Sequence, residues 1–358
     1  MTRMIFESAT PLARACDTLM RARRERDLEA FESATAQLWE AAQTASPGEL
    51  TAALSACAGM LAELGPGFGG EFAVLCGALV ERGADPDPLA MVLCMRLAEV
   101  AGQAAEFAQV WTREFPDEGV PEPEQAEFET ALERLDEVIA PDHAVRLTES
   151  WFGLASWMRC ATTVLQQSPT ARLACRCTPG VRAAFTALEQ VREDTGWVSM
   201  LLSVLDAEQL LVLHRGTGRG WRVSISGVGD NFQLHVLLAA ALSGPASAGM
   251  LEGLRVDPAW TAVALDAPYE AFGGQVKGWF NLVDAYGGWI WNEGVPADIP
   301  APEGLRIIQL EAPPYERTWD NSRRFPMMAA SITLDEVLSR DEAAMWLSRC
   351  TEGKPLGG

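Results

Sequence analysis

The stretch Trp221–Leu242, WRVSISGVGDNFQLHVLLAAAL, organises the second half of the chain. Its first six residues alternate apolar and polar side chains, and this period of two predicts a half-buried strand. A glycine-rich turn over 227–231 follows, and the apolar run after it predicts a helix. Asp230 or Asn231 is expected to cap this helix, because its side-chain oxygen can accept a hydrogen bond from a free backbone N–H. A glycine turn between a strand and a helix often forms part of a site.

Composition and charge limit the class of protein. The chain has 358 residues, of which 48% are hydrophobic and 22% charged, as expected of a soluble globular protein with two or three domains. The formal net charge is −21, and residues 1–150 carry most of it, with 11 basic and 27 acidic residues. An acidic surface repels phosphate groups, so neither nucleic acid nor a membrane is expected as a partner. We attribute the charge to solubility.

The cysteines and the start of the chain indicate a compartment. Most of the eight cysteines lie inside apolar helical patterns, where we expect small buried thiols rather than a disulfide framework. The first residues lack an apolar core of signal-peptide length. The longest clearly apolar run, Phe72–Val80, is too short to span a bilayer. A reduced, cytoplasmic protein is therefore expected.

Residues 1–195 are predicted to be all helical. Alanine and leucine are abundant, β-branched residues are sparse, and apolar positions recur every three or four residues. Ser46–Glu49 has the composition of a helix start, with a capping serine, a proline and a glutamate three positions after the serine. The acidic, proline-rich segment 114–129 is the candidate internal linker, and helices are expected again over 142–166 and 179–195. This spacing favours a helical bundle or a HEAT-like stack.

Residues 196–358 are predicted to form a mostly antiparallel sheet with a few helices, so the whole chain is classed as α+β. A capping box at 339–342 predicts a C-terminal helix. The predicted strands share apolar or aromatic residues bounded by turn residues. They are 209–214 and 221–226, joined as a hairpin; 260–265; 277–284 and 288–293, joined as a second, tryptophan-rich hairpin; and 306–311.

The turn after the central strand matches half of a dinucleotide-binding fingerprint. Gly227 and Gly229 are present, but Phe232 stands where the third glycine is required, and no βαβ unit is evident. A purely structural turn is the favoured interpretation. The three histidines are scattered and the cysteines show no second pair at ligand spacing, so neither a metal nor another cofactor is predicted.

Polar and aromatic residues near two turns form the candidate site. We expect a pocket between the 227–231 turn and the 289–298 end of the second hairpin, because tryptophans beside a few polar groups suit a bound ligand. Asp230, His235 and Glu293 are the candidate catalytic residues, with Glu293 or His235 as general base. The residues expected to bind the ligand are Asn231, Trp289, Trp291 and Asn292. A plain sheet core is the simpler interpretation of these tryptophans, and a partner-binding face is another.

Three blocks of the second half carry a resemblance. They are SGVGDNFQLH at 226–235, FNLVDAYGGWIWNEGVPADIP at 280–300 and PPYERTWD at 313–320. These blocks resemble a family of uncharacterised bacterial proteins, which have a helical N-terminal part and the same blocks near the C-terminus. The resemblance implies that the blocks belong to one module and adds no catalytic residue.

Two functions agree with these observations. The first is a cytosolic interaction or assembly protein, whose helical part binds another protein and whose tryptophan-rich sheet holds a partner or supports self-association. The absence of a complete catalytic motif favours it. The alternative is an enzyme or small-molecule binder with the pocket described above. Convergence of Asp230, His235 and Glu293 in an open cleft would favour catalysis.

Overall fold

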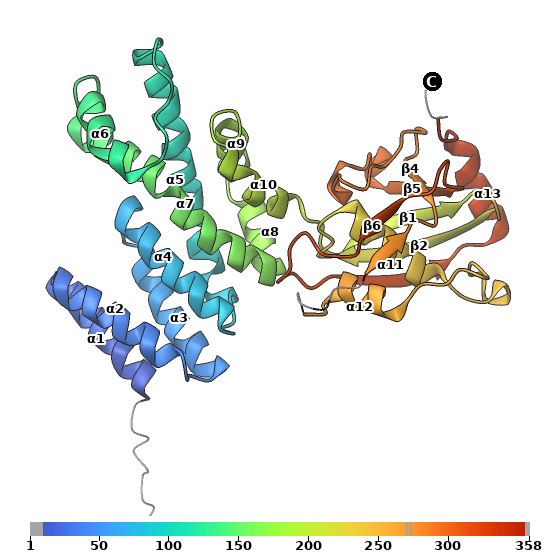
Figure 1. Cartoon of the computed structure of the whole chain (residues 1–358), viewed down its shortest axis with the longest axis horizontal. Helices are drawn as coiled ribbons and strands as arrows, with labels where there is room; N and C mark the ends of the chain where they lie inside the picture. The colour runs from blue at the N-terminus through green and yellow to red at the C-terminus, as the bar shows by residue number, and fades with distance from the viewer. Residues whose placement is uncertain (1–9, 269–270, 272–273, 355–358) are drawn as a thin grey trace, which may run out of the picture. The chain divides into compact units, whose positions relative to one another are not determined.

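The chain folds into two compact units, Met1–Leu202 and Ser203–Gly358, in a computed structural model that describes residues 10–268, 271 and 274–354. The first unit is helical and the second is a mostly antiparallel sheet with helices, which makes the protein α+β (Figure 1). The units part at residue 202, a few residues beyond the expected 195, and most of helix α10 (Gly196–Ser203) lies in the first unit.

The helices of the first unit begin where sequence signals place helix starts. Ser46 accepts a hydrogen bond from the Glu49 N–H while the Glu49 carboxylate accepts one from the Ser46 N–H, which is the expected capping box. The helices before α10 are α1 (Pro11–Glu25), α2 (Leu28–Ala42), α3 (Pro47–Leu61), α4 (Pro66–Glu81), α5 (Asp87–Glu114), α6 (Phe128–Asp136), α7 (Pro141–Gln167), α8 (Pro169–Cys177) and α9 (Val181–Leu188).

Helices α5 and α7 form the centre of this unit. Helix α7 contacts both α4 and α5, and α5 also contacts α3, α8 and α9. Trp151 and Trp157 of α7 are almost fully buried, and each indole N–H donates to a backbone carbonyl, at Pro121 and Pro66 respectively. By length and composition α5 is apolar enough to cross a membrane, and half of its most apolar window is buried within the protein.

Two helical predictions differ from the structure. The 179–195 segment is the short helix α9 followed by a turn of 3-10 helix, because Gly180 takes a positive φ of 87° and starts α9 after Pro179. The preceding helix α8 was not predicted. The candidate linker 114–129 lies inside the first unit, where it joins α5 to α6, and the bond from Trp151 to Pro121 ties it to α7.

A disulfide corrects the expectation that the cysteines are thiols. Cys94 of α5 and Cys175 of α8 are bonded, and both are fully buried. The packing of α5 on α8 brings their Cα atoms to 4.9 Å, although 81 residues separate them in the sequence. The remaining six cysteines are free, and four of those are buried as expected.

The second unit is built on a five-stranded sheet of order β4-β5-β1-β2-β7. The pairs are antiparallel except for β1 with β5, which is parallel. A separate two-stranded sheet joins β3 to β6. The strands are β1 (Glu208–His214), β2 (Arg219–Ser226), β3 (Gln275–Lys277), β4 (Asn281–Val283), β5 (Arg306–Glu311), β6 (Thr318–Asp320) and β7 (Ser331–Val337).

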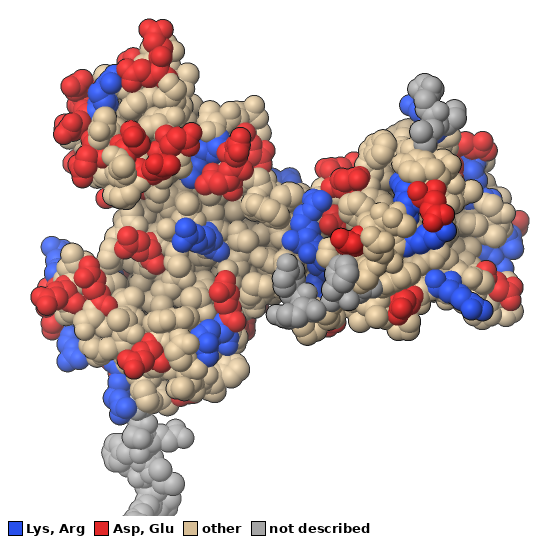
Figure 2. Space-filling view, viewed as in Figure 1, with Lys and Arg blue, Asp and Glu red and all other residues tan. Residues whose placement is uncertain are grey.

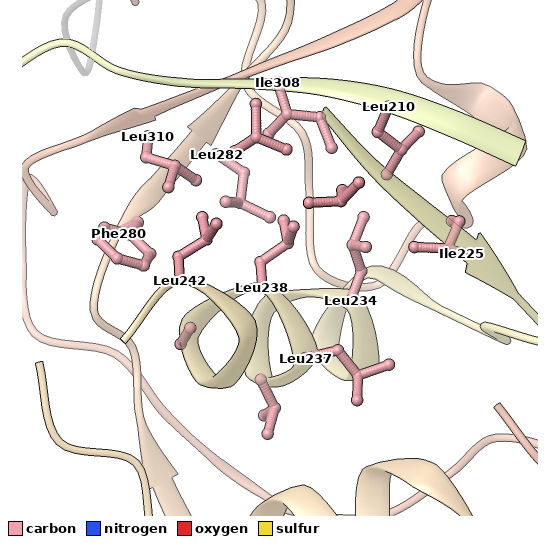
Figure 3. Packing of buried hydrophobic residues seen from close by; sticks show 14 of the residues in the cluster. Leu210, Ile225, Leu234, Leu237, Leu238, Leu242, Phe280, Leu282, Ile308 and Leu310 are labelled. Carbon is pink, nitrogen blue, oxygen red and sulfur yellow. The ribbon is translucent and has the colours of Figure 1, made fainter. Parts of the chain in front are cut away.

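Helices cover both faces of the central strand β1. Leu210 and Val212 face helix α11 (Asn231–Leu242), whereas Leu211 and Leu213 pack with the residues of helix α13 (Arg340–Arg349). This double burial explains the unbroken apolar run of β1. Figure 3 shows Leu234, Leu238 and Leu242 of α11 directed at the strands, with Leu237 on the other side of the helix. Because α11 also contacts α12 (Pro258–Leu265), it is apolar on all sides.

One strand prediction was wrong, and one predicted hairpin is confirmed only in part. Residues 260–265 belong to the helix α12, which starts at an Asp257 cap followed by proline, a helix signal that the apolar run concealed. The second hairpin is formed only in part. Val283 and Trp289 make an antiparallel bridge across the turn at 285–287, where the Asp284 N–H donates to the Gly288 carbonyl and the Ile290 N–H to the Leu282 carbonyl. The rest differs, because 275–277 pairs with β6 and 281–283 pairs with β5. The first hairpin, the strand at 306–311 and the Ser339 helix cap are confirmed.

Candidate functional site

The two turns predicted to flank a pocket are instead bonded to each other. The Asn231 N–H donates to the Gly294 carbonyl at 3.0 Å, and the Phe232 N–H donates to the Asn292 carbonyl at 3.1 Å. The Asn231 side-chain amide adds a bond to the Trp291 carbonyl at 2.8 Å. The first N–H groups of α11 are therefore satisfied by backbone carbonyls, which leaves no anion site there. The same bonds hold 291–294 at the start of α11, whereas the pairing of the second hairpin extends only as far as Ile290.

Gly227 is required by the turn itself. Its φ is 67°, and a Cβ atom placed on it would lie 2.2 Å from the Ala329 carbonyl oxygen. The backbone of 329 thus occupies the space that any other side chain would need. The glycine serves close packing of two chain segments, in agreement with a structural turn rather than a nucleotide fingerprint.

Asp230 caps α11, and it is one of the two residues that were predicted as the cap. Its Oδ1 accepts a hydrogen bond from the Gln233 N–H at 2.9 Å, and its Oδ2 lies 3.5 Å from Nε of Arg324. Burial raises the pKa of Asp230, and the Gln233 N–H and the Arg324 charge oppose that rise. Arg324 also donates to the backbone carbonyl of Glu293. The Asp230 carboxylate is therefore occupied in holding the helix start together.

His235 is a buried core residue. It has no exposed surface, and its Nε2 accepts a hydrogen bond from the Trp279 N–H at 3.1 Å. The ring contacts Trp279, Phe280 and Trp319, at centroid distances of 5.9, 5.8 and 5.1 Å. Burial, helped by the nearby Arg317 charge, lowers the pKa of His235 to about 3. The imidazole is therefore neutral at physiological pH.

A pocket opens beside the predicted position, between the 291–293 turn and the segment 315–319. We call it the Trp291–Trp319 pocket, and its volume is about 350 Å³. Four aromatic side chains line it, and the rings of Phe232 and Trp319 touch at 5.4 Å. Its lining residues are Phe232, Trp291, Asn292, Glu293, Tyr315, Glu316, Arg317, Thr318 and Trp319.

The predicted residues fall into three groups with respect to this pocket. Trp291, Asn292 and Glu293 line it. Trp289 stands behind Trp291, with ring centroids 5.7 Å apart, and its indole N–H donates to the Lys354 carbonyl. The remaining predicted residues, Asp230, Asn231 and His235, do not line it.

The candidate catalytic residues do not form a catalytic group. No hydrogen bond or ion pair joins any two of Asp230, His235 and Glu293, all of which the structure describes. The Glu293 carboxylate is exposed, whereas His235 is sealed behind Trp319. General base catalysis needs a basic atom within reach of substrate, and the buried imidazole offers none.

The predicted pocket did not include the wall formed by 315–319. The alternation of Tyr315, Arg317 and Trp319 in this wall is a strand signal that the prolines at 313 and 314 obscured. Arg317 lies over the Tyr315 ring at 5.6 Å and donates to the Phe280 carbonyl at 3.0 Å.

The first unit has a groove of a different kind between α2 and α4. Its volume is about 560 Å³, and its walls include the exposed rings of Trp39 and Phe68 and the buried ring of Phe31, which touches Phe68 at 5.1 Å. We call it the α2–α4 groove. It is lined by Phe31, Glu32, Thr35, Ala36, Trp39, Phe68, Glu71, Phe72, Val74, Leu75 and Ala78.

The fold and these two cavities define an α+β protein with an aromatic pocket in its sheet unit and an apolar groove in its helical unit. No cluster of three or more metal-ligating side chains occurs in the described part of the chain. No protein-family model, curated protein or solved structure matches this chain.

Proposed function

We propose that the protein is an interaction protein whose α2–α4 groove binds a basic, amphipathic helix of a partner protein. The observation that carries this proposal is an apolar groove whose two helices bear only negative charge. Helix α2 has Glu29, Glu32 and Glu40, helix α4 has Glu71 and Glu81, and neither helix contains lysine or arginine.

The aromatic side chains support a protein partner. Trp39 is 41% exposed and Phe68 is 37% exposed. Large aromatic rings that are exposed together in one surface groove usually mark a site where a second molecule binds. Grooves between two helices bind the apolar face of a third helix, which inserts side chains spaced three or four residues apart. A tryptophan that lines such a groove is the type of residue that dominates binding energy.

Charge selects the partner. Glu32 and Glu71 line the groove from opposite walls and form no ion pair with any residue in the described ranges. The wider unit is acidic as well: Figure 2 shows red carboxylates gathered over α6 and the loop before it, and residues 114–137 contain ten acidic residues and one basic residue. Such a field attracts a basic segment and speeds its association.

The test uses a designed peptide of about 18 residues, or five helical turns, with leucines along one face and lysines and arginines on the other. Its fluorescein-labelled form is titrated with the full-length protein, and anisotropy gives the Kd. We expect binding that weakens about tenfold or more in Trp39→Ala, because a large aromatic contact is lost, and that also weakens as the salt concentration rises.

Matched controls separate the groove from general surface effects. Trp197→Ala removes an exposed tryptophan of the same unit outside the groove, and it should leave the Kd unchanged. Glu32→Lys with Glu71→Lys should weaken the basic peptide and strengthen a peptide in which glutamates replace its basic residues. Absence of binding, equal binding by Trp39→Ala, or equal binding of both peptides would refute the proposal.

Catalysis by the predicted residues is not proposed. Its condition was convergence in an open cleft, and Asp230 and His235 instead serve the helix cap and the core of the second unit.

A further inference from the structure

We infer that the Trp291–Trp319 pocket binds a small, planar, uncharged heterocycle of the nucleobase or nucleoside class, which presents a carbonyl or ring-nitrogen acceptor to the side-chain N–H of Asn292. The pocket lies wholly in the second unit, so this inference is independent of the α2–α4 groove.

The first observation is an unpartnered buried amide. Asn292 lines the pocket and is only 4% exposed, yet its side-chain amide makes no hydrogen bond to any described residue, and its Oδ1 is buried. Buried polar side chains in folded proteins almost always have a partner. Because the Oδ1 is closed off from solvent, the free N–H donors of the amide are the groups that a molecule in the pocket can reach, and they can donate to a carbonyl or ring nitrogen on the edge of a base.

The second observation is the set of rings around that amide. Trp291 is 58% exposed and Tyr315 is 45% exposed, and Phe232 and Trp319 complete the lining. Such rings stack on any of the bases, because every base has an apolar face. A volume of about 350 Å³ accommodates a ligand of one or two rings.

The charges at the pocket select an uncharged ligand. The Glu293 carboxylate is exposed and forms no ion pair with any described residue, and Glu316 is paired with Lys277 at 2.9 Å. The unpaired carboxylate of Glu293 repels phosphate. The guanidinium of Arg317 lies in the same lining, stacked on Tyr315 and bonded to the Phe280 carbonyl, and it repels an organic cation. A neutral base or nucleoside avoids both repulsions.

The experiment is isothermal titration calorimetry of the full-length protein with adenosine, guanosine, cytidine and uridine, each beside its 5′-monophosphate. We expect at least one nucleoside to bind, and its monophosphate to bind about tenfold more weakly or worse because of the Glu293 carboxylate. Trp291→Ala, an exposed position that leaves the fold intact, should weaken the nucleoside about tenfold.

Asn292→Leu separates binding from stability. Leucine has a similar shape and removes an unpaired buried amide, so the thermal midpoint should stay the same or rise while nucleoside binding is lost. Trp39→Ala is the matched control in the other unit and should bind the nucleoside normally. The inference is overturned if none of the four nucleosides binds at millimolar concentration, if a monophosphate binds as tightly as its nucleoside, or if Trp291→Ala binds like the unmodified protein.

Discussion

Lowering the pH should destabilise the second unit through His235. In the folded protein burial lowers the pKa of this imidazole to about 3, whereas in the unfolded chain it titrates near its ordinary 6.5. The unfolded state therefore binds the extra proton as the pH falls below 6.5. Stability that is fully present above the unfolded pKa is lost progressively on the way down to the folded pKa.

The magnitude follows from the two pKa values. Between pH 7.5 and pH 5 the linkage costs about 2 kcal/mol, since each pH unit below 6.5 removes about 1.4 kcal/mol. The comparison protein is His235→Gln, which cannot titrate and keeps an oxygen that can accept from the Trp279 N–H. Lost ring packing lowers its stability at every pH, so the measured quantity is the difference between the pH slopes of the two proteins.

Two other groups titrate near this range, and the comparison cancels both. Burial lowers the pKa of His214, which adds to the loss of stability on acidification. Burial raises the pKa of Asp230, so that carboxyl takes up a proton more readily in the folded state and opposes the loss at the acidic end. Both groups are present in the unmodified protein and in His235→Gln.

The assay is urea unfolding at pH 7.5 and at pH 5 with pulsed hydrogen exchange, read by mass spectrometry on peptides that cover α11 and β1. This readout isolates the second unit, whereas the 12 tryptophans of the chain would report on both units together. Equal slopes in the two proteins would show that the imidazole is not held neutral, and the packing argument for His235 would fail.

Two further predictions concern the backbone and the disulfide. Gly227→Ala should lower the free energy of unfolding by more than about 2 kcal/mol, because alanine is strained at a positive φ and its Cβ would lie 2.2 Å from the Ala329 oxygen. Gly102→Ala, in open space on α5, should raise the free energy of unfolding by up to about 1 kcal/mol. Thermal unfolding measures both changes, and a small loss in Gly227→Ala would contradict the turn geometry. Alkylation of the urea-unfolded, unreduced protein should modify six cysteines and spare Cys94 and Cys175, and eight modified cysteines would contradict the pairing. Reduction of the disulfide should lower the free energy of unfolding of the first unit by on the order of 4 kcal/mol, because the loop that the disulfide closes is long.

Local signals in the sequence were sufficient to predict much of the fold. The capping box at Ser46, the Asp230 cap and the apolar run of β1 each depend on residues within a few positions of one another, and each was predicted. Strand β7 was missed because it lies at the sheet edge and its exposed residues hide a weak alternation of Ile332 and Leu334.

The features that could not be predicted from the sequence depend on contacts between residues that are far apart in the chain. The 288–293 segment pairs with 282–284 only as far as Ile290, because the Asn292 and Gly294 carbonyls beyond it accept hydrogen bonds from the N–H groups of Phe232 and Asn231. The cavity is lined by the 291–293 turn and by residues 315–319, which no local pattern associates with that turn.

The parallel pairing of β1 with β5 has a consequence for synthesis of the protein. Leu210 pairs with Arg306, so roughly a hundred residues are synthesised after β1 before its neighbour β5 leaves the ribosome. The helices of the first unit precede β1 in the chain and leave the ribosome before it. During that interval the β1–β2 hairpin has one free edge on each strand and apolar side chains on both faces. A nascent chain stalled before β5 therefore exposes the segment of this protein most prone to pair with another chain.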